Sequence, residues 1–295
     1  MKILYVAFIL SLFISAGCNE EPKTKINQNL ITDDLHKSFE FLEIPEKVVT
    51  LAPNLTELMF ELGLGNKIIG NTSYCNFPEP AKSIENVADL LTVNLEKIVA
   101  LNPDLIFITA EGNSRSDYDK LTRLGLKVFV SKPKNYVGIK KTLLDMSKIF
   151  KVSEKADSIV KNWDSRIAKV KQTHDKLVYK TALFLISTKP LFSAGKNSFV
   201  HQILTFAGLE NLSANSDVNY PMLNREEIVI KNPDYILLYS NNNNDVNELL
   251  KIYPEWNTLS AIVNKRVFYI DADLFSRPGP RFVDAVEELN KLVLK

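Results

Sequence analysis

Two stretches of this chain are nearly identical, and this internal repeat is the strongest constraint on its fold. Residues 94–108 read NLEKIVALNPDLIFI, and residues 224–238 read NREEIVIKNPDYILL. Asn, Glu, Ile, Val, Asn, Pro, Asp and Ile recur at the same positions. Self-similarity of this kind indicates that one structural unit has been used twice. We therefore expect two similar lobes, each built around one copy of the repeat.

Each copy is predicted to form a short helix followed by a buried strand. Asn94 and Asn224 are typical N-cap residues, and Glu227, three residues after Asn224, predicts a capping box. The Asn-Pro-Asp sequence limits each helix, because the residue before a proline is disfavoured in the α conformation. The continuous apolar runs at 105–108 and 235–238 predict parallel strands that are covered on both faces.

The rest of the chain alternates predicted strands with predicted helices, which favours an α/β fold with parallel sheets. We expect an N-terminal lobe over residues 46–135, a linker over 136–178 and a C-terminal lobe over 179–295. The longest predicted helix, 153–174, is about 33 Å long and lies between the two copies of the repeat. An ordinary surface helix would show the same apolar stripe, but this position favours a backbone helix that joins two lobes, with a ligand cleft between them.

Local signals define the start and the end of each lobe. In the first lobe, a predicted strand at 47–51 is followed by a helix for which Asn54 and Glu57 predict a capping box. The second lobe begins with a predicted strand at 181–186. Its last predicted strand, 266–270, precedes a loop rich in aromatic and charged residues.

Residues 1–17 are predicted to be a lipoprotein signal peptide. The apolar run at 3–14 is shorter than the about 20 residues that span a bilayer. Small residues before Cys18 resemble a bacterial lipobox, in which the cysteine is lipidated, although Ser15 stands where that pattern usually has leucine. A secretory signal with an incidental cysteine is the alternative. The polar segment 18–45 is predicted to be a tether, so we expect a membrane-anchored lipoprotein on the periplasmic or cell-surface side.

The sequence carries no recognisable motif for catalysis or for metal binding. The net charge of +1 gives no electrostatic reason to expect a nucleic acid partner. Three scattered histidines and two cysteines predict neither a metal site nor a disulfide framework, and Cys75 is expected to be a buried small apolar residue. The sequence has no G-x-S-x-G motif and no complete P-loop. An exported two-lobed chain without such motifs is typical of proteins that capture a ligand between lobes.

The first lobe closely resembles the substrate-binding proteins of bacterial ABC importers for vitamin B12. The resemblance lies in VVTLAPNLTELMFELGLGNKIIG at 48–70, SYCNFPEPAKSIENV at 73–87 and the first copy of the repeat. It continues more weakly to the C-terminus. This class, which has a rigid helical backbone, also serves ferric siderophores and haem. The resemblance implies a monomeric, non-enzymatic protein without a cofactor that binds cobalamin or a related corrinoid and delivers it to the membrane subunits of an ABC transporter.

The resemblance also implies which residues contact the ligand in the cleft. The matching positions are Tyr74, Leu90, Phe192, Tyr220, Asp273 and Arg277. Aromatic faces suit the flat apolar parts of a corrin, and Asp273 would accept hydrogen bonds from its amide groups. Leu90 and Tyr220 stand where the B12 binders have tryptophan, which makes the cleft less aromatic. Phe192 also fits a core position, and Arg277 also fits a structural ion pair.

The same resemblance implies that one glutamate on each lobe docks onto arginines of the transporter, and the matching residues are Glu96 and Glu226. Stabilisation of the helix dipole would favour glutamate at these positions as well. Two alternatives remain for the function. One is a carrier of ferric siderophores or haem, in which Arg115, Arg277 and Arg281 would face an anionic ligand. The remote one is an exported enzyme.

Overall fold

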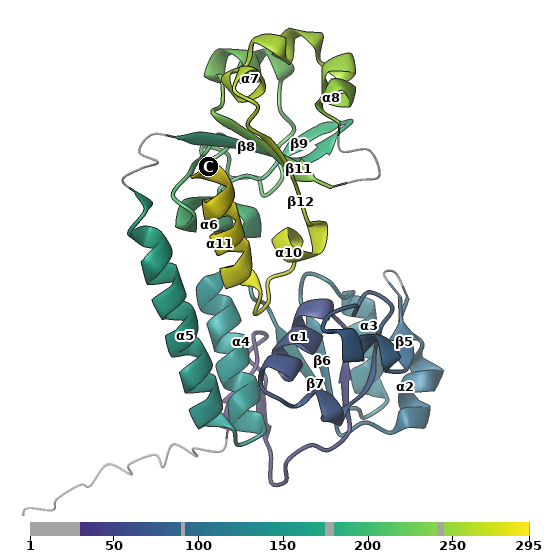
Figure 1. Ribbon diagram of the computed structural model, residues 1–295. Helices are drawn as coiled ribbons and strands as arrows, with labels where there is room; N and C mark the ends of the chain where they lie inside the picture. Colours follow the sequence, from purple (N-terminus) through teal and green to yellow (C-terminus); the bar gives the residue numbers. More distant parts are fainter. Residues whose placement is uncertain (1–29, 90–91, 175–179, 241–244, 295) are drawn as a thin grey trace, which may run out of the picture.

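The computed structural model describes residues 30–89, 92–174, 180–240 and 245–294, which form two α/β lobes joined by long helices (Figure 1). The first lobe holds a parallel sheet with the strand order β5-β4-β3-β6-β7. Its strands are β3 (Val48–Thr50), β4 (Ile68–Thr72), β5 (Asn86–Ala88), β6 (Leu105–Thr109) and β7 (Val128–Ser131). Its helices are α1 (Pro53–Glu61), α2 (Leu95–Leu101), α3 (Arg115–Arg123) and the 3-10 helices η1 (Gly65–Lys67) and η2 (Glu79–Ser83).

The second lobe repeats this plan with a sheet in the order β10-β8-β11-β12. These four strands are parallel, and β9 pairs antiparallel with β8. The strands are β8 (Thr181–Thr188), β9 (Leu191–Ser193), β10 (Glu210–Asn211), β11 (Tyr235–Tyr239) and β12 (Val267–Ile270). The helices are α6 (Phe199–Phe206), α7 (Arg225–Lys231), α8 (Val246–Ile252), η4 (Pro254–Thr258), α9 (Ser260–Val263), α10 (Ala272–Ser276) and α11 (Phe282–Val293). The predicted α/β fold with two parallel sheets is confirmed.

Two antiparallel helices, α4 (Tyr136–Ile149) and α5 (Ser153–Lys171), connect the lobes. The predicted long helix is α5, which begins at Ser153 as expected and ends three residues before the predicted end. Its Arg166 donates to Asp284 at 2.6 Å and to Glu287 at 2.8 Å, both on α11 of the second lobe. The ring of Tyr136 on α4 stacks on Phe282 of α11 with centroids 5.1 Å apart. Both helices are therefore fixed to the second lobe as well as to the first.

The two copies of the repeat fold alike, as predicted. Asn94 accepts from the backbone N–H of Lys97 at 3.0 Å, and Asn224 accepts from that of Glu226 at 2.8 Å. Asn102 and Asn232 end the two helices in the left-handed conformation, with φ of 47° and 43°. An asparagine tolerates that conformation better than most residues.

The capping box predicted for the second copy is wrong. The side chain of Asn224 accepts from the N–H of Glu226, two residues on. The carboxylate of Glu227 instead lies 2.6 Å from the ammonium of Lys231, one helical turn away. An i,i+4 ion pair on the helix surface has replaced the reciprocal cap.

The aspartate of each Asn-Pro-Asp sequence ties its lobe together. Asp104 accepts from the backbone N–H of Lys47 at 2.8 Å, just before β3. Asp234 accepts from the N–H of Thr181 at 3.0 Å, at the start of β8, and from the ammonium of Lys180 at 2.8 Å. Burial opposes ionisation of Asp234, but Lys180 and Thr181 outweigh it and hold the pKa of that carboxyl below its usual range. The repeat therefore fixes the start of the neighbouring strand.

Replacing Asp234 by asparagine is expected to lower the free energy of unfolding at neutral pH by about 1.5 kcal/mol, because charged hydrogen bonds are lost. The pKa of Asp234 is lower in the folded chain than the about 3.9 of an unfolded one. Its contribution is therefore complete above that value and is lost as the pH falls through the folded pKa. Urea denaturation at neutral and acidic pH measures both effects, and Asp157→Asn on the exposed face of α5 is the control.

The tether predicted over 18–45 is not what the structure shows for residues 30–41. Here β1 (Leu30–Thr32) and β2 (Ser38–Glu40) form an antiparallel hairpin. Ile31, Phe39 and Phe41 are buried, and the ring of Phe39 lies 5.4 Å from that of Phe129 on β7. Three apolar side chains in a short polar segment are enough to hold it on the first lobe. The predicted signal peptide and Cys18 lie outside the described residues.

Candidate ligand-binding site

A cavity of about 250 Å³ lies between the lobes, at the carboxyl ends of the first-lobe strands. Asn54 follows β3, Glu111 follows β6 and Lys132 follows β7 on its first-lobe side. The second lobe contributes 276–278, at the end of α10. In open α/β sheets, ligands bind outside the carboxyl ends of the strands. The topology therefore makes this cavity the candidate ligand site.

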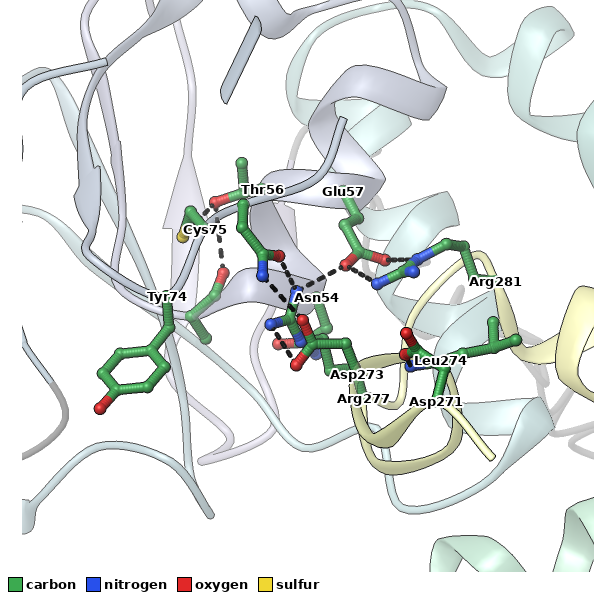
Figure 2. Close-up of polar contacts among 12 residues, drawn as sticks. Asn54, Thr56, Glu57, Tyr74, Cys75, Asp271, Asp273, Leu274, Arg277 and Arg281 are labelled. Carbon is green, nitrogen blue, oxygen red and sulfur yellow. Dashed lines mark hydrogen bonds and ion pairs between the residues drawn. The ribbon is translucent and has the colours of Figure 1, made fainter. Parts of the chain in front are cut away.

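A polar cluster closes the lobe junction beside this cavity (Figure 2). Its centre is Glu57 of α1, whose side chain is 1 % exposed. The Glu57 carboxylate accepts from Arg281 at 2.9 and 2.7 Å and from Arg277 at 3.3 Å. The Arg281 guanidinium also lies over the ring of Phe77, 4.3 Å from its centroid. A first-lobe carboxylate is thus paired with two second-lobe arginines.

The capping box predicted at Asn54 and Glu57 is wrong for a reason that lies in the sequence. Pro53 occupies the first helical position, which suits proline, so Ala52 is the N-cap and no side chain caps α1. The freed amide of Asn54 donates to the carbonyl of Pro278 at 3.1 Å. The backbones approach closely here, because a Cβ on Gly279 would lie 3.2 Å from the Asn54 Cβ.

Asp273 and Arg277, both predicted to contact the ligand, belong to this cluster. Asp273 stands in the first turn of α10, which begins at the cap residue Asp271 where the sequence predicted a loop. Its carboxylate forms an ion pair with Arg277 at 2.6 Å and accepts from the amide of Asn76 at 2.7 Å, and its side chain is 40 % exposed. Arg277 donates at 2.7 Å to the side-chain oxygen of Asn76. Arg277 is therefore ion-paired and also lines the cavity, whereas the carboxylate of Asp273 is partly exposed.

The two predicted tyrosines are half exposed. Tyr74 follows β4 with 46 % of its surface exposed, and Figure 2 shows its ring pointing away from the polar cluster. Tyr220 is 51 % exposed. Partial burial of its ring raises the pKa of Tyr220, and the nearby carboxylate of Glu111 adds to this effect. Tyr220 of the second lobe therefore lies near enough to a first-lobe carboxylate to feel its charge.

The remaining predicted ligand residues are not gathered at the cavity. Phe192 lies in β9, half-buried, and forms a bridge with Met222 rather than lining the cavity. Leu90 lies outside the described residues. The site residues therefore stay predictions, and among the described ones Arg277 is the one that lines the cavity.

The predicted docking glutamates lie on the surface of separate lobes, in the first turns of α2 and α7. Both are exposed. Glu226 lies 3.3 Å from the guanidinium of Arg225, which is also 3.2 Å from Glu255. Within the described part of the chain, Glu96 makes no ion pair of this kind. Glu96 and Glu226 occupy equivalent positions in the repeat, but only Glu226 has an arginine beside it among the described residues.

Nothing in the sequence predicted that Glu57 and Asn76 would pair with Arg277 and Arg281 of the late loop. The only available signal was Pro53, which excludes Asn54 from the N-cap position and leaves Glu57 without a capping role.

Cys75 is buried, as predicted, and its sulfur receives a hydrogen bond from Thr56 at 3.1 Å. Among residues 30–89, 92–174, 180–240 and 245–294, no group of three or more histidine, cysteine or acidic residues is placed to hold a metal ion. Nor does a helix in these ranges have the length and apolar character needed to cross a bilayer.

Comparison with known proteins agrees with this architecture. The family model for periplasmic binding proteins matches residues 48–274. The vitamin B12-binding protein of Salmonella typhimurium is 32% identical over 243 residues, which cover 82% of this chain and 88% of the relative. An ABC transporter substrate-binding lipoprotein of Bacillus subtilis is 27% identical over 97% of this chain and 95% of its own length. The crystal structure of the periplasmic vitamin B12 binding protein of Vibrio cholerae superposes with a TM-score of 0.73 at 27% identity, covering 85% of this chain and 97% of that one. The chain therefore belongs to the periplasmic binding protein family.

Proposed function

We propose that this protein is the extracytoplasmic substrate-binding component of an ABC importer and that it binds cobalamin or a related corrinoid. The relatives above are binding proteins of transport systems rather than enzymes. We further propose that lipidated Cys18 anchors the chain to a membrane, and that it acts as a monomer which passes its ligand to the membrane subunits through Glu96 and Glu226.

The observation that carries the choice of ligand is the chemistry of the cleft. Glu111 lines the cavity, Asp273 beside the cavity-lining Arg277 offers a carboxylate that is 40 % exposed, and the phenol of Tyr220 lies near enough to Glu111 to feel its charge. Carboxylates accept hydrogen bonds from amide N–H groups, and a phenol both donates and accepts. Amide groups surround a corrin ring, whose flat apolar parts suit a tyrosine face.

A siderophore or haem carrier is supported less well, because the arginines expected to meet an anionic ligand already have partners. Arg277 and Arg281 are paired with Glu57, and Arg115 lies 3.1 Å from Asp119 on the outer helix α3. An ion-paired guanidinium attracts a ligand carboxylate less strongly than a free one. The cleft therefore favours a ligand that presents amides.

Calorimetric titration of the protein lacking residues 1–18 with cyanocobalamin tests this proposal. We expect stoichiometric binding of one corrinoid per chain, with a dissociation constant of about 1 µM or lower. Haemin and a ferric siderophore serve as comparison ligands in the same buffer. Binding of either comparison ligand in the absence of cyanocobalamin binding would assign the protein to the alternative class of carriers.

A further inference from the structure

Glu57 is buried behind the ligand cavity and contacts two arginines of the opposite lobe. Its side chain is 1 % exposed. With Arg281, Phe77 and Trp163 it borders a separate cavity of about 350 Å³ on the other side of the lobe junction. It is not among the residues that line the ligand cavity. Any effect of Glu57 on the ligand must therefore pass through a neighbouring side chain.

Arg277 is that neighbour, because it lines the ligand cavity. One of its terminal nitrogens donates to Glu57 at 3.3 Å and to Asn76 at 2.7 Å. The other lies 2.6 Å from the carboxylate of Asp273, with which it forms an ion pair. Arg277 and Arg281 carry two positive charges, and Glu57 and Asp273 carry two negative ones, so these four groups sum to zero. Without the Glu57 carboxylate the sum is +1.

We propose that Glu57 is a specificity-determining residue, which neutralises Arg277 and Arg281 from behind the cavity and makes the cleft favour uncharged, amide-bearing ligands over ligands with several carboxylates. The inference rests on the proposed function in one respect, which is that this cavity holds the ligand. Glu57 balances part of the charge of Arg277, so Arg277 presents a weaker positive charge to a ligand in the cavity that it lines. Glu57 is thus a positioning residue that acts through Arg277.

The experiment compares wild type with Glu57→Gln in titrations with two probes. Cyanocobalamin presents uncharged amides, and haemin is a flat metal chelate with two propionate carboxylates. Glutamine keeps the shape of the side chain but removes its charge and replaces one accepting oxygen by a donating NH2 group. We expect the affinity for haemin relative to cyanocobalamin to rise about tenfold in the variant, which corresponds to about 1.4 kcal/mol.

Glu61→Gln is the matched control, because Glu61 lies one turn further along α1 and borders the same rear cavity. It removes the same charge without releasing Arg277, so the affinity ratio should stay at the wild-type value. If Glu57→Gln does not fold, Arg281→Met gives the opposite test, because the four groups then sum to −1. The affinity for haemin relative to cyanocobalamin should then fall below the wild-type value, and an unchanged or higher ratio would overturn the proposal.

The two probes separate the two proposals. Failure of wild type to bind cyanocobalamin contradicts the proposed function, whatever the variant does. The inference about Glu57 is overturned if haemin binding is not strengthened in the variant, or if both ligands weaken by the same factor, as a purely structural role requires. A rise of the same size in Glu61→Gln would also overturn it, because the effect would then be unspecific.

Discussion

Arg281→Met is expected to lower the free energy of unfolding by about 3 kcal/mol, because it leaves a buried carboxylate without its main partner. Glu57 then keeps only the 3.3 Å contact with Arg277, which is shared with Asp273. Methionine fills much of the volume of the arginine stem, so the decrease in the free energy of unfolding comes mainly from the unpaired charge of Glu57. Urea denaturation followed by circular dichroism measures it.

The double variant Glu57→Leu with Arg281→Met separates charge from packing. Replacing both ends of a buried ion pair by apolar groups is often neutral or stabilising, so most of the loss should be recovered. Arg123→Met, an exposed arginine on α3, should change stability by less than about 0.5 kcal/mol. A double variant as unstable as Arg281→Met would show that the loss comes from packing and not from the buried charge.

Combining Glu96→Ala with Glu226→Ala is expected to abolish uptake and to leave ligand affinity unchanged. Neither residue lines the cavity, and the two carboxylates stand on different lobes, as docking onto two membrane subunits requires. Uptake of labelled cyanocobalamin by cells that depend on this protein measures transport, and calorimetry measures affinity. Glu154→Ala, an exposed glutamate on α5, should leave both unchanged.

The two single variants, Glu96→Ala and Glu226→Ala, should reduce uptake to different extents. The transporter must compete with Arg225 for Glu226, since these two side chains lie 3.3 Å apart. The net gain from docking Glu226 is therefore smaller, and Glu96→Ala alone should reduce uptake more than Glu226→Ala alone. A loss of ligand affinity in the double variant would contradict the docking role and would place these glutamates in the binding site.

Local signals in the sequence were sufficient for the two-lobed fold. The Asn caps, the Asn-Pro-Asp sequences and the apolar runs after them act within a few residues, and Asn94, Asn224 and the strands at 105–109 and 235–239 are found where expected. The hairpin at 30–40 was missed because its strands are three residues long. Strands that short leave little periodicity to detect.

Short-range sequence patterns could not predict the contacts at the lobe junction. Glu57 is separated from Arg277 by 220 residues and from Arg281 by 224, and no helical or strand period links positions that far apart. Arg277 was assigned to the ligand or to an ion pair from the resemblance alone. Only the relative position of the two lobes shows that its charge is already balanced by Glu57 and Asp273.

Gly279 allows the backbones of the two lobes to approach closely beside the cavity. A methyl group at 279 would come within 3.2 to 3.3 Å of Asn54, which is closer than carbon atoms normally pack. Asn54 lines the cavity, whereas Gly279 does not. A larger residue at 279 is therefore expected to alter the cavity from a position outside its lining.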